Sequence, residues 1–180
     1  MRVIRFVRPA LAIGLLAALA IFPACTVRPL YSSAPATSGG TATMAEELAS
    51  IAIKPVTTRE AQQVRNHLMF LFYGGAAAPA SPTYTLALSV SAKVDVAASI
   101  QMTTEDEEPT AKTVTMVGRY WLLAADGTEV ASGRRQIASS YDIPTQEFAA
   151  MRALRDAEDR AARELAELLR LAVAQNLASR

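Results

Sequence analysis

The chain has 180 residues, 51% hydrophobic and only 6% aromatic, which allows one domain of ordinary size with a thin core. Arg2, Arg5 and Arg8 precede residue 25 and no acid does, so the remainder carries 15 basic against 17 acidic side chains. A nearly neutral domain has no global field to attract nucleic acid, so an anionic ligand has to be bound by a local cluster of cations.

Residues 1–24 have the features of a secretory signal peptide. A short basic start is followed by an uncharged apolar run over residues 10–22, too short to span about 30 Å of hydrocarbon comfortably. The run ends in Phe22-Pro23-Ala24-Cys25, and Cys25 is the only cysteine of the chain. A small residue before a cysteine at the cleavage site is typical of a bacterial lipobox. We therefore expect cleavage before Cys25 and acylation of its thiol; a plain signal peptide with an incidental cysteine is the alternative.

Residues 25–45 are predicted to join the acylated cysteine to the folded part as a flexible tether, because residues 32–45 are mainly small and polar. Thr26 follows the cysteine in place of aspartate, which by analogy with bacterial sorting favours the outer membrane. Residues 46–180 are predicted to form a single periplasmic α+β domain of a Gram-negative bacterium.

The first predicted elements of this domain are a strand over residues 48–56 and a helix directly after it. Thr57 and Glu60 have the spacing of a capping box, and apolar residues then recur at intervals of three to four. Gly74-Gly75 end this helix, and residues 76–82 form a loop.

Three longer strands follow. Residues 83–96 and 113–123 alternate between apolar and polar side chains, which predicts strands with one buried face. Asp126-Gly127 predicts a hairpin turn into a return strand over residues 129–141. The apolar residues at the two ends of this return strand have opposite parity, so we expect a β-bulge near Gly133.

A long helix is predicted from Pro144 to about Leu177. Its apolar stripe is formed by Met151, Leu154, Ala161, Leu165, Leu168 and Ala172. The order β-α-β-β-β-α predicts an α+β two-layer sandwich, with a four-stranded, mostly antiparallel sheet and two helices on one face. The other face carries Thr, Ser, Lys, Arg and Trp121 side chains, so it contacts water or a partner.

Residue types that most enzymes need are scarce. His67 is the only histidine, and its place beside Leu68 on the predicted helix favours a surface or boundary position. The chain lacks the ligands for a zinc site, a nucleophile elbow, a phosphate loop and a dinucleotide fingerprint. Acidic residues at 105–108 could attract a cation, but a solvated hairpin loop is the simpler interpretation. We expect a protein without catalytic activity, cofactor or metal.

Three stretches of this chain resemble the lipopolysaccharide-assembly lipoprotein family LptE, in its alphaproteobacterial form. They are Cys25-Thr26-Val27-Arg28-Pro29-Leu30-Tyr31, then Arg59 with Gln63-Val64-Arg65-Asn66-His67-Leu68, and finally Phe148 with Asp156-Ala157 and Arg160-Ala161-Ala162. The predicted element order agrees with the resemblance, which spans most of residues 25–177. Thr26 and Ser32 stand where glycines are common in such proteins.

The resemblance implies a lipoprotein of the outer membrane that is not an enzyme. It would plug the lumen of the LptD β-barrel and help to insert lipopolysaccharide into the outer leaflet. An auxiliary lipoprotein of a lipid-transport ATP-binding-cassette system is a second hypothesis and predicts an apolar, lipid-sized pocket. A periplasmic hydrolase is a third, which the missing catalytic residues disfavour.

Contact with lipopolysaccharide would need cations at defined places, because its head group is anionic. The candidates are the basic residues of the predicted strands and strand ends, namely Lys93, Lys112, Arg119, Arg134 and Arg135. By strand parity Lys93 and Arg119 are expected on the uncovered face. Only one of the neighbouring Arg134 and Arg135 can share that face unless the expected bulge turns the other towards it.

Overall fold

The structure is a computed structural model that describes residues 43–101 and 107–179, without the side chains of residues 98–101 and 107–109. The chain divides into two units, Met1–Ser32 and Ser33–Arg180, and every described residue belongs to the second. The predicted signal peptide, Cys25, most of the predicted tether and most of the acidic segment at 105–108 lie outside the described residues.

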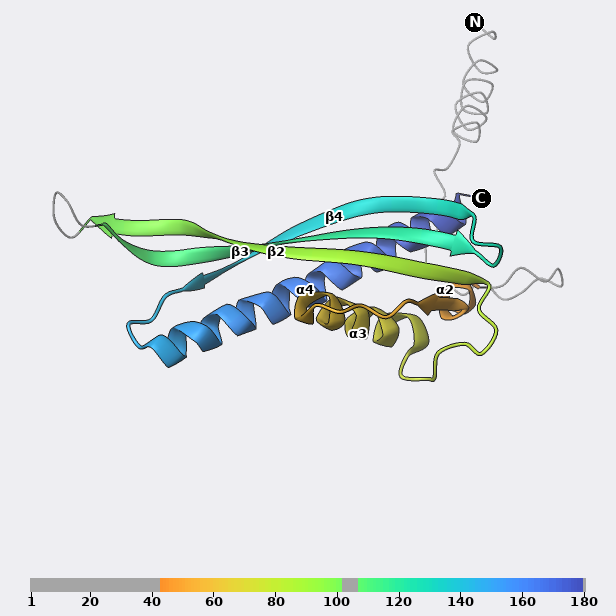
Figure 1. The fold of residues 1–180 in the computed structure, drawn as a ribbon, viewed down its shortest axis with the longest axis horizontal. Helices are drawn as coiled ribbons and strands as arrows, with labels where there is room; N and C mark the ends of the chain where they lie inside the picture. Colours follow the sequence, from red (N-terminus) through yellow and green to blue (C-terminus); the bar gives the residue numbers. More distant parts are fainter. Residues whose placement is uncertain (1–42, 102–106, 180) are drawn as a thin grey trace, which may run out of the picture. The chain divides into compact units, whose positions relative to one another are not determined.

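The described unit is a two-layer α+β domain, as predicted. Its elements in chain order are α2 (Met44–Ala49), β1 (Ile51–Ile53), α3 (Arg59–Tyr73), β2 (Tyr84–Gln101), β3 (Glu107–Ala124), β4 (Glu129–Asp142) and α4 (Glu147–Ala178). The sheet order is β1-β2-β3-β4, with β1 parallel to β2 and the other pairs antiparallel. The two long helices, α3 and α4, lie on the same side of the sheet (Figure 1).

The start of the domain differs from the prediction. A short helix, α2, occupies part of the predicted strand over residues 48–56, and only Ile51–Ile53 pair as a strand. Thr43 and Glu46 form a complete capping box, which gives the helix a defined start within the predicted tether. Pairing ends soon after β1 because Pro55 has no N–H to donate.

The pairing register separates the strand residues into two faces. Leu86 pairs with Leu122 and Val114 with Ser139, and all four side chains are buried against the helices. The predicted apolar faces of β2 and β3 are therefore on the helix side. The core is completed by helix residues with no exposed surface, which include Val64, Leu68, Leu165, Leu169 and Val173.

The bulge in β4 lies at Val130, so the prediction of a bulge near Gly133 is wrong. Leu122 pairs with Ala131 while Leu123 pairs with Glu129, which leaves Val130 as the extra residue. Gly133 has a different reason to be glycine. It lies opposite Tyr120, and a Cβ there would come within 2.7 Å of the Cε1 atom of the tyrosine ring.

Helix α3 has the predicted extent, with a different cap. The side chain of Thr58, not Thr57, accepts the hydrogen bond from the Ala61 amide at 3.3 Å. Gly74 ends the helix in the left-handed region, with φ of 61°.

Helix α4 has 32 residues, a length of about 48 Å. None of its first ten residues is buried, and its buried face begins at Ala157. Met151, predicted in the apolar stripe, is 52% exposed. Helix α4 is amphipathic as expected, but its first turns extend beyond α3, so their apolar side chains stay exposed.

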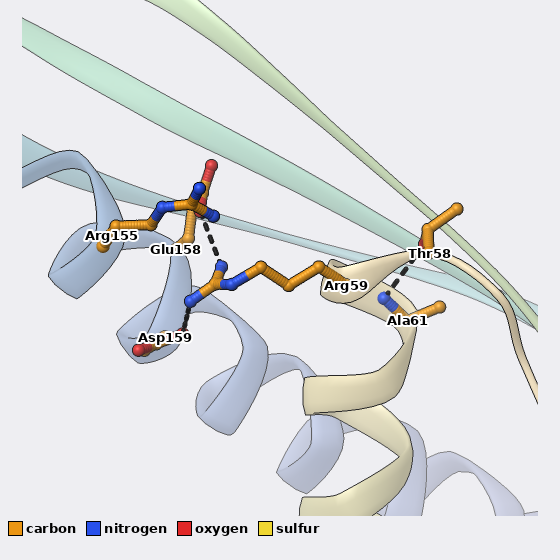
Figure 2. A network of polar contacts seen from close by, with 6 residues as sticks. All are labelled: Thr58, Arg59, Ala61, Arg155, Glu158 and Asp159. Carbon is orange, nitrogen blue, oxygen red and sulfur yellow. Dashed lines mark hydrogen bonds and ion pairs between the residues drawn. The ribbon is translucent and has the colours of Figure 1, made fainter. Parts of the chain in front are cut away.

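One ionic cluster joins the start of α3 to α4 (Figure 2). The Arg59 guanidinium contacts the Glu158 carboxylate at 2.8 Å and the Asp159 carboxylate at 2.9 Å. Arg155 approaches the same Glu158 oxygen at 3.6 Å. These contacts place the first turn of α3 level with residues 158 and 159 of α4, so the preceding part of α4 extends beyond the start of α3.

Candidate functional site

The sheet face opposite the helices, called here the open sheet face, consists of small, polar and basic side chains. Its members are Thr85, Ala87, Ser89, Ser91, Lys93, Asp95, Thr113, Thr115, Val117, Arg119, Trp121, Leu123, Ser132, Arg134, Gln136, Ala138 and Ser140. None of these residues is buried. Both long helices lie on the other side (Figure 1), so this face is the large surface left for solvent or a partner.

Two arginines lie side by side near the middle of this face. The register puts Ser89, Arg119 and Arg134 in one row across three strands. Together with Ser91 and Val117 they line a hollow of ≈ 210 Å³. The bonds that position them are the ladder hydrogen bonds of a twisted antiparallel sheet, so the site is built on rigid elements.

The positive charge of this hollow is not neutralised within the described residues. Arg134 donates to the Gln136 amide oxygen at 2.8 Å, and neither arginine forms an ion pair with a described acidic side chain. Like charges directly opposite one another on neighbouring strands are unfavourable. An anion between them would remove that repulsion, and each guanidinium could offer two parallel donors.

The other predicted cations are placed elsewhere. Lys93 is on the open sheet face, as expected, but it is about 13 Å along β2 from Ser89. Its ammonium group forms an ion pair with Asp95 at 2.5 Å. Lys93 therefore carries less free charge than the arginine pair and does not line its hollow.

Lys112 and Arg135 are on the helix side of the sheet. Lys112 pairs with Val96 and Tyr141, and Arg135 pairs with Gly118, all on that side. Because the bulge lies at Val130, before both arginines of β4, normal alternation sends Arg134 and Arg135 to opposite faces. The structure thus brings together Arg119 and Arg134, and it separates the other three candidates from them.

Arg135 lies near a buried tyrosine instead of an anion site. Burial raises the pKa of the Tyr120 hydroxyl, and the charge of Arg135 together with a hydrogen bond from Asn176 offsets part of that rise. The Asn176 amide donates to this hydroxyl at 2.6 Å, which ties β3 to the end of α4.

Sequence analysis did not identify Ser89 and Ser91 as part of the hollow. Their alternation with Leu88 and Val90 shows that they face away from the core. Only the strand register shows that Ser89 lies beside Arg119. A hydroxyl beside a guanidinium pair extends the donor set for a phosphate or a sugar hydroxyl.

The site offers binding groups and no evident reactive group. Within residues 43–101 and 107–179, no three His, Cys, Asp or Glu side chains gather as a metal site requires. His67 belongs to α3, on the other side of the sheet. In the same part of the chain, no helix is both long and apolar enough to cross a membrane.

Comparison with solved structures gives this arrangement a context. A candidate lipoprotein from Caulobacter crescentus CB15 matches with a TM-score of 0.56 and 26% identity, over 76% of this chain and 97% of that chain. Rare lipoprotein B from Shewanella oneidensis matches with a TM-score of 0.52 and 10% identity, over 72% of this chain and 95% of that chain. The described domain shares its fold with these two bacterial proteins. No protein-family model and no curated protein matches the chain.

Proposed function

We propose that this chain is an outer-membrane lipoprotein of the LptE kind, lipidated at Cys25, that plugs and assists the LptD β-barrel in assembling lipopolysaccharide. The observation that carries the proposal is the open sheet face, on a fold shared with rare lipoprotein B. Both long helices of the described domain, α3 and α4, lie on one side, so the polar side remains for a partner. The interior of a large membrane barrel is polar, which makes it a chemically matched surface.

The packing of the domain favours a plug over a lipid carrier. A carrier of the kind used by lipid-transport systems needs an apolar, lipid-sized cavity. Here the space between sheet and helices is filled by large side chains with no exposed surface, among them Tyr120, Ile51, Leu68, Met116 and Leu165. The hollow at the arginine pair is open to solvent and holds ≈ 210 Å³.

Site-specific crosslinking tests the partner. Photoreactive residues at Thr115 and Gln136 would probe the open sheet face, and the same residue at Gln62 or Arg163 would probe exposed positions on the helices. We expect the open-face positions to capture a large outer-membrane barrel in a one-to-one complex. Depletion of the protein should also lower barrel maturation and surface lipopolysaccharide. If Thr115 and Gln136 capture no barrel protein in cells, the plug function is wrong.

The anchor has a separate test. Cys25→Ser should leave the precursor unacylated and mislocalised, because no other thiol can accept the diacylglycerol group. Fatty-acid labelling followed by fractionation of membranes measures both effects. Label that persists in Cys25→Ser would contradict acylation at this residue.

Contact with lipopolysaccharide is assigned to the arginine pair. Arg119→Glu combined with Arg134→Glu should weaken binding of the purified lipoprotein to lipopolysaccharide, since two donor groups for phosphate become two negative charges. The matched control is Lys112→Glu with Arg135→Glu, an equal change of charge on the helix side of the same strands. Circular dichroism checks folding. Equal losses in the two folded double variants would show that only net charge matters and would remove Arg119 and Arg134 from the site.

A further inference from the structure

The first turns of α4 carry a second surface that the proposed barrel contact does not use. Phe148 is 80% exposed and Met151 is 52% exposed, although both are large and apolar. With Arg152 and Arg155 they line an open hollow of ≈ 520 Å³. These four residues, called here the α4 tip, include two apolar and two basic side chains and no acidic one.

The packing explains why the α4 tip is uncovered. Arg59 ties the start of α3 to Glu158 and Asp159, so α3 cannot cover the preceding turns of α4. Val94 and Val96, on the helix side of β2, are also 41% and 57% exposed. The helical layer therefore does not fully cover the sheet at this end, and apolar side chains there remain exposed.

The α4 tip has one basic side chain, Arg152, without an ion pair in the described part of the chain and a second, Arg155, in a longer, shared ion pair. Arg152 is exposed and has no ion-pair partner among the described residues. Arg155 is 3.6 Å from Glu158, whose carboxylate Arg59 already holds at 2.8 Å. The neighbouring Asp156 is paired with Arg160. The surface thus combines apolar groups with one arginine, Arg152, that no described acidic side chain neutralises, and a second, Arg155, that shares Glu158 with Arg59.

We propose that the α4 tip docks on an anionic lipid bilayer surface when the lipoprotein is outside its barrel complex. Phe148 and Met151 would enter the boundary between head groups and acyl chains, and Arg152 and Arg155 would meet lipid phosphates. All four residues belong to one helix surface, so there are no facing walls to recognise a rigid partner. A fluid bilayer adapts to such a protruding helix end.

The inference rests on the proposed lipid anchor, which would hold the domain close to the bilayer. Residues 26–42, part of the predicted tether, separate the expected acylated cysteine from the described domain, and a flexible linker of that length would have a root-mean-square span of about 23 Å. Fully extended, it spans at most about 60 Å, which exceeds the length of α4 of about 48 Å. Either end of the domain can therefore reach the membrane, and tethering raises the effective concentration of the surface for a weak contact.

The test uses the full acylated lipoprotein in lipid nanodiscs. Thr145 is exposed and lies just before the α4 tip. A Thr145→Cys variant carries the only free thiol once Cys25 is acylated, and an environment-sensitive dye on that thiol reports insertion. In discs that contain phosphatidylglycerol, we expect a blue shift and quenching by brominated acyl chains. Discs of phosphatidylcholine alone should give a much weaker response.

Variants then separate the contribution of the apolar side chains from that of the arginines. Phe148→Ser with Met151→Ser should abolish quenching, whereas Phe70→Ser, which removes a 67% exposed phenylalanine from α3, should leave it unchanged. Arg152→Gln and Arg155→Gln should each lower the ratio of docked to free domain by about fivefold in phosphatidylglycerol discs. Arg163→Gln, at another exposed position of α4, is the control for the loss of one charge.

The outcomes distinguish this inference from the proposed function. A dye that stays in water while mass spectrometry confirms acylated Cys25 overturns lipid docking and leaves the barrel proposal standing. A blue shift only after the barrel is added also overturns it, in favour of a protein partner. If Cys25 carries no acyl chain, the anchor is wrong, and dye quenching on phosphatidylglycerol vesicles by a Thr145→Cys chain that also carries Cys25→Ser decides the docking separately.

Discussion

Gly133 offers the sharpest test of how the sheet is packed. An added Cβ would lie 2.7 Å from Cε1, 2.8 Å from the hydroxyl oxygen and 2.9 Å from Cζ of Tyr120. Non-bonded carbon atoms prefer about 3.5–4.0 Å, so all three contacts are repulsive. Tyr120 is 2% exposed and its hydroxyl accepts the Asn176 hydrogen bond at 2.6 Å. The ring therefore cannot move aside without disturbing the attachment of α4.

The size of the effect follows from these contacts. Overpacking of a core costs about 1–3 kcal/mol. Loss of the hydrogen bond from Asn176 would add about 1 kcal/mol. Alanine also lowers the conformational entropy of the unfolded chain relative to glycine, which stabilises the folded state by about 0.4–1 kcal/mol. We therefore expect Gly133→Ala to lower the free energy of unfolding by about 2 kcal/mol, within the range for overpacked cores.

Urea unfolding followed by the fluorescence of Trp121, the only tryptophan, measures this change. Gly118→Ala is the matched control, because the three atoms nearest to its Cβ would be methyl groups of Leu165 and Leu169 at 3.1–3.4 Å. Those ends of flexible side chains can shift, so a loss below about 1 kcal/mol is expected. Gly133→Ala should also cost less in a Tyr120→Leu background. Equal losses in the two backgrounds would refute the packing argument.

Three further predictions concern stability. Arg59→Ala should lower the free energy of unfolding by about 1 kcal/mol, since two partly exposed ion pairs are lost; an unchanged urea midpoint would show that the joint between α3 and α4 does not depend on them. Arg134→Gln should raise the free energy of unfolding by about 0.2–1 kcal/mol, because it removes the repulsion with Arg119. A decrease would show that the charge of Arg134 is stabilised by a favourable partner. Burial raises the pKa values of Tyr73 and Tyr120, so both side chains are protonated in the folded and in the unfolded protein below about pH 10. Above that pH the tyrosines of the unfolded chain ionise first, so the free energy of unfolding should fall with rising pH. The fall should be less steep in Tyr120→Phe. If urea titrations give the same dependence of the free energy on pH for both proteins, Tyr120 does not contribute.

Strand faces were predictable because alternation follows from backbone geometry alone. The sides of Lys93 and Arg119 were therefore predicted and confirmed. The pairing of Arg119 with Arg134 needed the register, which depends on an extra residue in β4. Val130 breaks the parity of that strand, whereas Gly133 keeps it and only lacks a side chain. From the sequence alone, the bulge could be placed at either residue. The structure is needed to show that Val130 is the bulge and that Gly133 is a glycine because the Tyr120 ring leaves no room for a side chain.

The ends of the elements were harder to predict because tertiary packing decides them. Leu48 fits the apolar pattern of a strand, but the capping box at Thr43 directs it into α2. Met151 fits the apolar stripe of α4, but a stripe is buried only where another layer lies over it. Arg59 fixes where the start of α3 lies along α4, and no local pattern near Met151 contains that information. An amphipathic pattern thus predicts a helix more reliably than it predicts burial.

The placement of the arginine pair bears on how an anion would bind. Arg119 and Arg134 project from strands whose opposite faces hold buried Tyr120 and the glycine beneath its ring. Those strands cannot separate to relax the repulsion without opening the core. The strands therefore keep the two arginines adjacent in the free protein, and an arriving phosphate needs only side-chain rotation to contact both guanidinium groups. Preorganised charge of this kind reduces the ordering that binding requires. It also makes the contact depend strongly on salt, because the hollow is open to solvent.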